Sequence, residues 1–214
     1  METGRPAALS GRRAEAARND ARILEAARAV FVADPDAPIS AVATRAGVGI
    51  SALYRRYPSK EELLRKLCID GLQEYIDIAR DAVDDLGSEP WDVFARFMRS
   101  IVEADVHTLT IRLAGRFRPT DEDNRNSLVA ESLNRELVAR SQTAGVLRED
   151  VTPDDLTYVF EQVAGIRGAT AARTDELRAR YLTLHLDSLR APGRTALPGP
   201  PPSAEEQLTR WMPS

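Results

Sequence analysis

The chain has 214 residues, of which 43% are hydrophobic, 29% charged and 6% aromatic. This length fits one domain, or a small domain fused to a larger one, and the apolar share excludes intrinsic disorder of the whole chain. No apolar run approaches the ~20 residues of a membrane span, and no apolar stretch follows the arginines near the start, so we expect no secretory signal and a cytoplasmic protein. The single cysteine, Cys68, excludes an internal disulfide and a cysteine-rich metal site.

Charge is distributed unevenly along the chain. Residues 1–60 hold ten Lys/Arg and six Asp/Glu, which gives 10 − 6 = +4, whereas the net charge of the whole chain is −4. The remaining residues, 61–214, therefore carry −8. A basic N-terminal part on an acidic body points to a polyanionic partner for the N-terminal part alone, although arginine-rich solvated surfaces are also common.

The N-terminal elements are short helices. Residues 1–18 lack an apolar stripe and are expected to form a flexible basic arm, whose arginines either follow a DNA groove or are disordered. A helix is expected over about 19–33, because Ile23, Ala27 and Phe31 recur on one face. It ends before Pro35, and two short helices follow at about 38–46 and 51–57, separated by Gly47-Val48-Gly49.

Helical texture continues through the rest of the chain. A long amphipathic helix is expected over 59–86, with Ser59 as its N-cap and two acids in its first turn. Further helices are expected at about 90–106, 107–115, 125–144, 153–172 and 175–190. Six of the 13 prolines lie in residues 191–214, so 192–214 reads as a proline-rich tail. Its Trp211 and Met212 either dock on the body or belong to a frayed terminus.

The most informative segment is ISAVATRAGVGISALYRRYPSKEELL, residues 39–64. Gly47 lies where the chain must turn sharply, and glycine tolerates a positive φ without a Cβ penalty. Leu53 and Tyr57 give the second short helix an inward face. The opposite face presents small, hydroxyl, aromatic and basic residues, which suits a helix whose N-terminal end enters a DNA groove. The segment is therefore a helix-turn-helix candidate.

At these residues the sequence resembles the DNA-binding domain of the TetR family of bacterial repressors. The resemblance covers residues 19–64: a first helix ending in Phe31, the run Val42-Ala43-Thr44-Arg45-Ala46-Gly47-Val48, and Leu53-Tyr54-Arg55-Arg56-Tyr57 followed by Pro58-Ser59-Lys60. Val42 and Tyr57 replace the more usual Ile and Phe. Ser40 is shorter than the charged or long polar residue that often contacts the DNA backbone at its position.

The resemblance implies an all-α protein with a three-helix DNA-binding domain at 19–60, an effector-binding and dimerisation domain at 61–191, and a homodimer on a palindromic operator. The implied DNA contacts are Ser40, Ser51, Ala52, Tyr54, Arg55, Arg56 and Lys60. Among these, Ser51 and Ala52 are expected to read bases and the others to hold the backbone. In the alternative reading, Tyr54 pads the core, and the basic side chains are simply solvated.

The resemblance also implies release from the operator by a small, mainly apolar ligand. Phe94, Phe97, Met98 and Ile101 recur at helical spacing, and they either form ordinary core or line an effector cavity together with His107. The last two helices are expected to form the dimer interface, because their apolar residues exceed what a two-helix hairpin covers from one side. The interface set is Phe160, Val163, Ile166, Leu177, Tyr181 and Leu184.

Other functional classes find little support in the sequence. The chain has only two histidines, no glycine-rich phosphate loop and no GxSxG motif, so we expect neither an enzyme nor a bound metal or cofactor. A helical adaptor would not explain the paired short helices or the +4 N-terminal part.

Overall fold

The computed structural model describes residues 6–113, 116–193, 195–203 and 206, with the side chains of 6–14 and 110–112 outside that description. The predicted all-α class is confirmed: within the described residues the only extended pairing is an antiparallel bridge between Leu147 and Arg190. The chain divides into two compact units, Met1–Leu67 and Cys68–Ser214. The division falls inside a long helix rather than at the expected residue 60.

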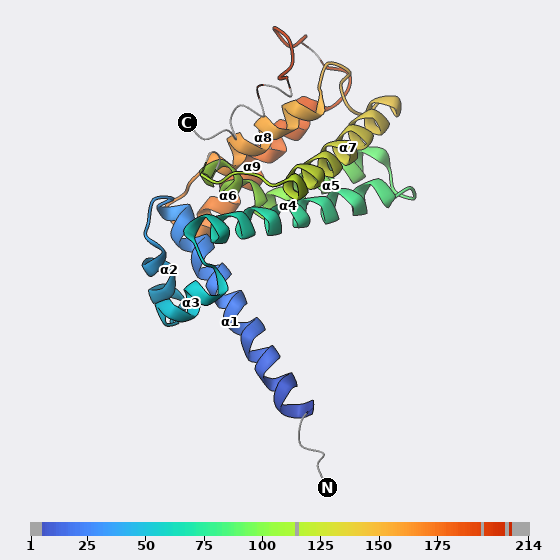
Figure 1. Ribbon diagram of the computed structural model, residues 1–214. Coiled ribbons are helices and arrows are strands. Elements are labelled where there is room, and N and C mark those ends of the chain that lie inside the picture. Colours follow the sequence, from blue (N-terminus) through green and yellow to red (C-terminus); the bar gives the residue numbers. More distant parts are fainter. Residues whose placement is uncertain (1–5, 114–115, 194, 204–205, 207–214) are drawn as a thin grey trace. The chain divides into compact units, whose positions relative to one another are not determined.

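The first unit contains α1 (Pro6–Ala33), α2 (Ile39–Ala46), α3 (Ile50–Arg56) and the start of α4 (Lys60–Asp84), all visible in Figure 1. Helix α1 begins far earlier than expected, so the flexible arm predicted for 1–18 is wrong for residues 6–18. The segment is rich in alanine and arginine, which favour helix without needing a buried face. A proline at its first position is also compatible with a helix start.

Apolar side chains from all four helices meet in the core of this first unit. Phe31, Val42, Leu53 and Leu63 are each fully buried. The other buried residues of this core are Ile23, Ala26, Ala27, Ala37, Ile39, Ala43, Ala46, Tyr57, Leu64 and Leu67. The predicted inward face of the second short helix is therefore correct at both Leu53 and Tyr57.

The second unit holds the remainder of α4 and five further helices. These are α5 (Pro90–Glu103), α6 (Val106–Leu113), α7 (Asp121–Thr143), α8 (Pro153–Gly165) and α9 (Ala171–Leu189). Helix α5 is central, since it packs against α6, α7, α8 and α9 (Figure 1). Its buried side chains, Val93, Phe94, Phe97, Met98 and Ile101, form the middle of the core.

The boundary between α8 and α9 differs from the sequence prediction. Helix α8 ends at Gly165, and Ile166 is extended, with φ −68° and ψ 133°. Thr170 then caps α9, its hydroxyl accepting the backbone N–H of Arg173 at 3.1 Å. Apolar periodicity did not locate this break because Ile166 keeps the helical spacing without continuing the helix.

The start of the predicted tail is tied to the second unit. Buried Arg148 pairs with Asp150 through Nε–Oδ1 at 2.6 Å and donates to the carbonyl of Thr195 at 2.7 Å. Asp150 in turn accepts the backbone N–H of Leu197 at 3.1 Å. Trp211 and Met212 lie outside the described residues. Among the helices described, none combines the length and apolar character that a membrane crossing requires.

Candidate functional site

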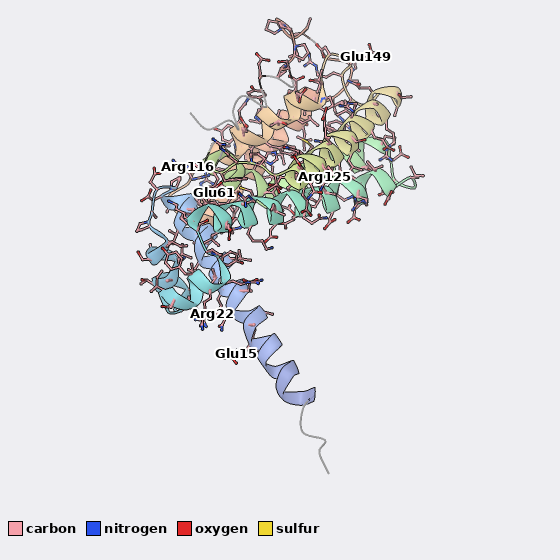
Figure 2. The ribbon with its side chains drawn as sticks, viewed as in Figure 1. Glu15, Arg22, Glu61, Arg116, Arg125 and Glu149 are labelled. Carbon is pink, nitrogen blue, oxygen red and sulfur yellow. The ribbon has the colours of Figure 1, made fainter. Side chains whose placement is uncertain are left out.

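The turn between α2 and α3 is built around Gly47, whose φ of 64° is left-handed. Its N–H and that of Val48 bond back to the carbonyls of Thr44 and Ala43 at 3.2 and 3.1 Å, which closes α2. Arg22, labelled in Figure 2, donates from Nη2 to the carbonyl of Ala46 at 2.7 Å. A Cβ at Gly47 would lie only 3.0 Å from that Nη2, so the turn requires glycine for its backbone and favours it for space.

Helix α3 separates a buried face from an exposed one. Leu53 is fully buried, whereas Tyr54 is 45% exposed and Ser51 and Arg55 are exposed too. Ala52 is half-buried. The reading in which Tyr54 pads the core is therefore wrong. A surface that offers a hydroxyl, a phenol and a guanidinium has the donors that contact phosphates and base edges.

Arg56 is held by the protein itself. Its Nε donates to Asp20 Oδ1 at 2.8 Å and its Nη2 to Asp20 Oδ2 at 2.9 Å, a two-bond ion pair across from α1. Tyr57 also donates its hydroxyl to Asp20 Oδ1, at 2.7 Å. The pairing with Arg56 holds the pKa of the Asp20 carboxyl below its usual range. Sequence reasoning missed Asp20, because its partners lie 36 and 37 positions away.

The start of α4 lies next to this surface within the first unit. Ser59 caps the helix as predicted, its hydroxyl accepting the N–H of Glu62 at 3.1 Å. Lys60 is half-buried, and its Nζ lies 5.2 Å from the centroid of the Phe31 ring, a cation–π contact. Ser40 is exposed on α2, and its carbonyl accepts the hydroxyl of Thr44 at 3.0 Å.

A second candidate site is a small cavity in the helical unit. It measures about 10 Å³, the space of roughly one water molecule. It is lined by Ile101, Val102, Asp105, His107, Phe160, Ala164 and Arg178. Of the five predicted ligand contacts, Ile101 and His107 reach the cavity. Phe94, Phe97 and Met98 are fully buried in the core and do not line it, because they occupy the inner face of α5.

Arg178 is the polar centre of this cavity. It is buried, and it donates from Nη1 to Asp105 Oδ1 at 2.7 Å and from Nη2 to Thr108 Oγ1 and the Ala164 carbonyl at 3.1 and 2.9 Å. Its Nε has no hydrogen-bond partner in the described part of the chain. Asp105 itself takes a left-handed φ of 52° at the junction of α5 and α6. No sequence pattern marked this cluster, because its members come from α6, α8, α9 and a junction.

Two of the lining residues, His107 and Phe160, belong to an aromatic cluster. His107 stacks on Tyr75 with ring centroids 5.7 Å apart and meets Phe160 edge-on at 4.7 Å. Burial lowers the pKa of His107 to about 4, against an opposing effect of Asp105, so the ring is neutral at pH 7. Tyr75 donates its hydroxyl to Asn134 at 2.7 Å. No group of three or more His, Cys, Asp and Glu in the described residues is arranged to hold a metal ion.

The predicted interface residues fall into two groups. Phe160 and Val163 are buried within the unit's own core, so their assignment to a subunit interface is wrong for this fold. Helical periodicity could not distinguish the two apolar faces of α8. On α9, by contrast, Tyr181 is 45% and Leu184 56% exposed, and Leu177 on the same face is half-buried. Ile166, just beyond α8, is half-buried as well.

Models of known protein families match both units of the chain. The model of bacterial regulatory proteins of the tetR family matches residues 23–67, and the model of the SbtR-like transcriptional regulator C-terminal domain matches residues 89–191. No relative was found among proteins with curated descriptions.

Solved structures show the same fold. A TetR transcription regulatory protein from Mycobacterium vanbaalenii is 28% identical with a TM-score of 0.54, covering 84% of this chain and 99% of that one. LfrR from Mycobacterium smegmatis, solved in complex with proflavine, is 23% identical with a TM-score of 0.61, covering 85% and 99%. CprB from S. coelicolor A3(2) is 16% identical with a TM-score of 0.63, covering 91% and 94%.

The two matched ranges fall on the two units, the helix-turn-helix unit and the helical body. The chain therefore belongs to the tetR family of bacterial regulatory proteins and is a DNA-binding transcriptional regulator.

Proposed function

We propose that this regulator is a cytoplasmic repressor that binds a palindromic operator as a homodimer. The proposal of a homodimer rests on a second apolar face of α9. Leu182, Leu186 and Leu189 face the core of their own unit, yet Tyr181 and Leu184 form an exposed apolar stripe on the same helix. This exposed stripe supports a protein interface on α9. A two-fold dimer carries two recognition helices, whose half-sites in this class of protein are ~34–36 Å apart.

The exposed side of α3 supports the assignment of DNA contacts. We assign base reading to Ser51 and Ala52 near the N-terminal end of α3, and phosphate binding to Tyr54, Arg55 and Lys60. Ser40 on α2 is assigned a backbone contact through its short hydroxyl. Changing Lys60 to Ala should weaken binding to all sequences and reduce the salt slope by about one per subunit, because a phosphate contact carries no sequence information.

The central cavity supports control by a small ligand. Its apolar walls and few convergent polar groups are the combination found in ligand sites. At about 10 Å³ the cavity is too small for an effector, so binding must displace lining side chains. Tyr75 on α4 stacks on His107, and α4 continues without a break back to Lys60. A ligand that separates these rings would act directly on the helix that begins at the proposed DNA surface.

Energetics sets one condition on this control. The ligand must bind the DNA-incompetent state more tightly, because equal affinity for both states shifts nothing. A coupling of ~1–3 kcal/mol, or about 5–150-fold in operator affinity, is the usual scale. LfrR, solved in complex with proflavine, shows that a protein of this fold holds a small molecule.

The test is footprinting on the DNA upstream of the protein's own gene, with and without a compound library. We expect protection of two half-sites centred about 10 base pairs, or a multiple of one helical turn, apart. We also expect release by at least one compound. Equal binding to specific and random DNA at physiological salt would contradict the repressor assignment. Specific binding that no compound releases would contradict ligand control alone.

A further inference from the structure

Arg56 is the last residue of α3, and its positive charge is already paired with a carboxylate of the protein. The guanidinium makes two hydrogen bonds to the two carboxylate oxygens of Asp20. Its neighbour Arg55 is exposed and has no ion pair among the described residues. Of the two adjacent arginines at the end of the recognition helix, only Arg56 is paired with an acidic residue, Asp20.

The carboxylate of Asp20 is fixed more firmly than the arginine. Its side chain is 19% exposed, against 59% for Arg56, and the buried Tyr57 donates a second hydrogen bond to it. If Arg56 moved away to a DNA phosphate, Asp20 would stay in place and lose that cation beside a polyanion. The repulsion between the uncovered carboxylate and the phosphates would offset the contact that Arg56 gained.

We propose that Asp20 is a restraining residue for DNA binding, which keeps Arg56 paired within the protein and withholds it from the phosphate backbone. The protein then neutralises one phosphate fewer per subunit than the basic residues of α3 would allow. Because phosphate contacts strengthen binding to every sequence alike, the restraint lowers the affinity for DNA in general. The proposal uses only the DNA-binding activity and does not depend on the operator, the dimer or the ligand.

Salt dependence separates this restraint from a merely structural ion pair. Each neutralised phosphate contributes about 0.9 to the slope of log K against log salt. Freeing one arginine should therefore raise affinity for DNA about 3–4-fold more in 50 mM than in 200 mM salt, for each subunit bound. A structural ion pair whose loss merely loosens the fold would lower affinity and leave this slope unchanged.

The experiment measures binding of the full chain to a random-sequence duplex by fluorescence anisotropy between 50 and 200 mM salt. Asp20→Asn is nearly isosteric and retains an oxygen for Tyr57. We expect it to steepen the slope by about 0.9 per subunit. Arg56→Ala uncovers the Asp20 carboxylate beside the phosphates, so it should weaken binding without steepening the slope. The matched control Arg55→Ala should flatten the slope by about 0.9. The double variant Asp20→Asn/Arg56→Ala should return to the slope of the wild type.

Three results would overturn the proposal. A double variant with a slope about 0.9 flatter than that of the wild type would mean that Arg56 already holds a phosphate in the wild type. An unchanged slope in a folded Asp20→Asn variant would mean that Asp20 restrains nothing. A double variant as steep as Asp20→Asn alone would mean that Asp20 acts only through its own charge. Circular dichroism checks each variant for folding, and if Asp20→Asn fails to fold, Asp20→Ser replaces it in both the single and the double variant.

Discussion

Replacing His107 by phenylalanine should remove a pH dependence of stability that the aromatic cluster creates. The ring lies between Tyr75 and Phe160, and burial lowers its pKa from 6.5 to about 4. In the unfolded chain the imidazole takes up a proton near pH 6.5, whereas the folded protein does not until about pH 4. The contribution of His107 to the free energy of unfolding is therefore fully present above pH 6.5 and is lost as the pH falls towards 4.

The magnitude follows from the width of this window. Each unit of pKa difference corresponds to about 1.4 kcal/mol, so a difference of roughly 2.5 units gives about 3 kcal/mol at full effect. Phenylalanine retains an aromatic ring for Tyr75 and Phe160 but has no proton to bind. His185 on α9, whose pKa is also lowered by burial, offers the matched control His185→Asn.

Urea unfolding followed by circular dichroism from pH 7.5 to 4.5, at one fixed protein concentration, measures the effect. The wild type and His185→Asn should lose stability across this range more steeply than His107→Phe. Other titrating groups, such as Asp154, whose pKa is raised by burial, are common to all three proteins. An identical loss in the wild type and in His107→Phe would refute the inference that a neutral, buried imidazole lies in this cluster.

Three further outcomes are expected. The double substitution Tyr181→Glu/Leu184→Glu should give monomers in sedimentation and weaken operator binding. Leu197→Glu, at a similarly exposed position on the tail, should leave the oligomer intact. Dimers that persist in the double variant would refute the α9 interface. Leu53→Ala should cost about 2–5 kcal/mol of unfolding free energy, because the side chain is fully buried, and a loss below ~1 kcal/mol would contradict its core position. Arg178→Met should lower the free energy of unfolding by about 3 kcal/mol, the low end for a broken buried ion pair, because Asp105 is 37% exposed. An unaltered denaturation midpoint would show that the ion pair contributes nothing to stability.

The helix-turn-helix could be predicted because its determinants are local. Gly47 marks the turn, Leu53 and Tyr57 mark the inward face of α3, and Ser59 marks the start of α4, all within a short stretch of chain. Each of these signals depends on backbone conformation or helical spacing, which neighbouring residues decide. Side-chain pattern and structure therefore agree most closely in this segment.

The failed predictions concern features that depend on tertiary packing. Phe160 and Val163 have the spacing of an interface stripe, but only the packing of α8 on α5 and α6 shows that they face inward. Arg56 stays a predicted DNA contact, but only the fold brings Asp20 of α1 to its guanidinium. The start of α1 was misplaced for a different reason: helix propensity sufficed over residues whose sequence has no apolar stripe to signal a helix.

The bonds of Arg148 and Asp150 to Thr195 and Leu197 determine where the chain can be cut. A truncation after Leu189, at the end of the last helix, would remove two hydrogen-bond partners of this ion pair and uncover a guanidinium that is otherwise buried. A shortened protein for crystallisation or NMR should therefore retain the segment through at least Leu197. A C-terminal affinity tag or fusion should be attached after Leu197. The first part of the proline-rich segment thus belongs structurally to the helical body.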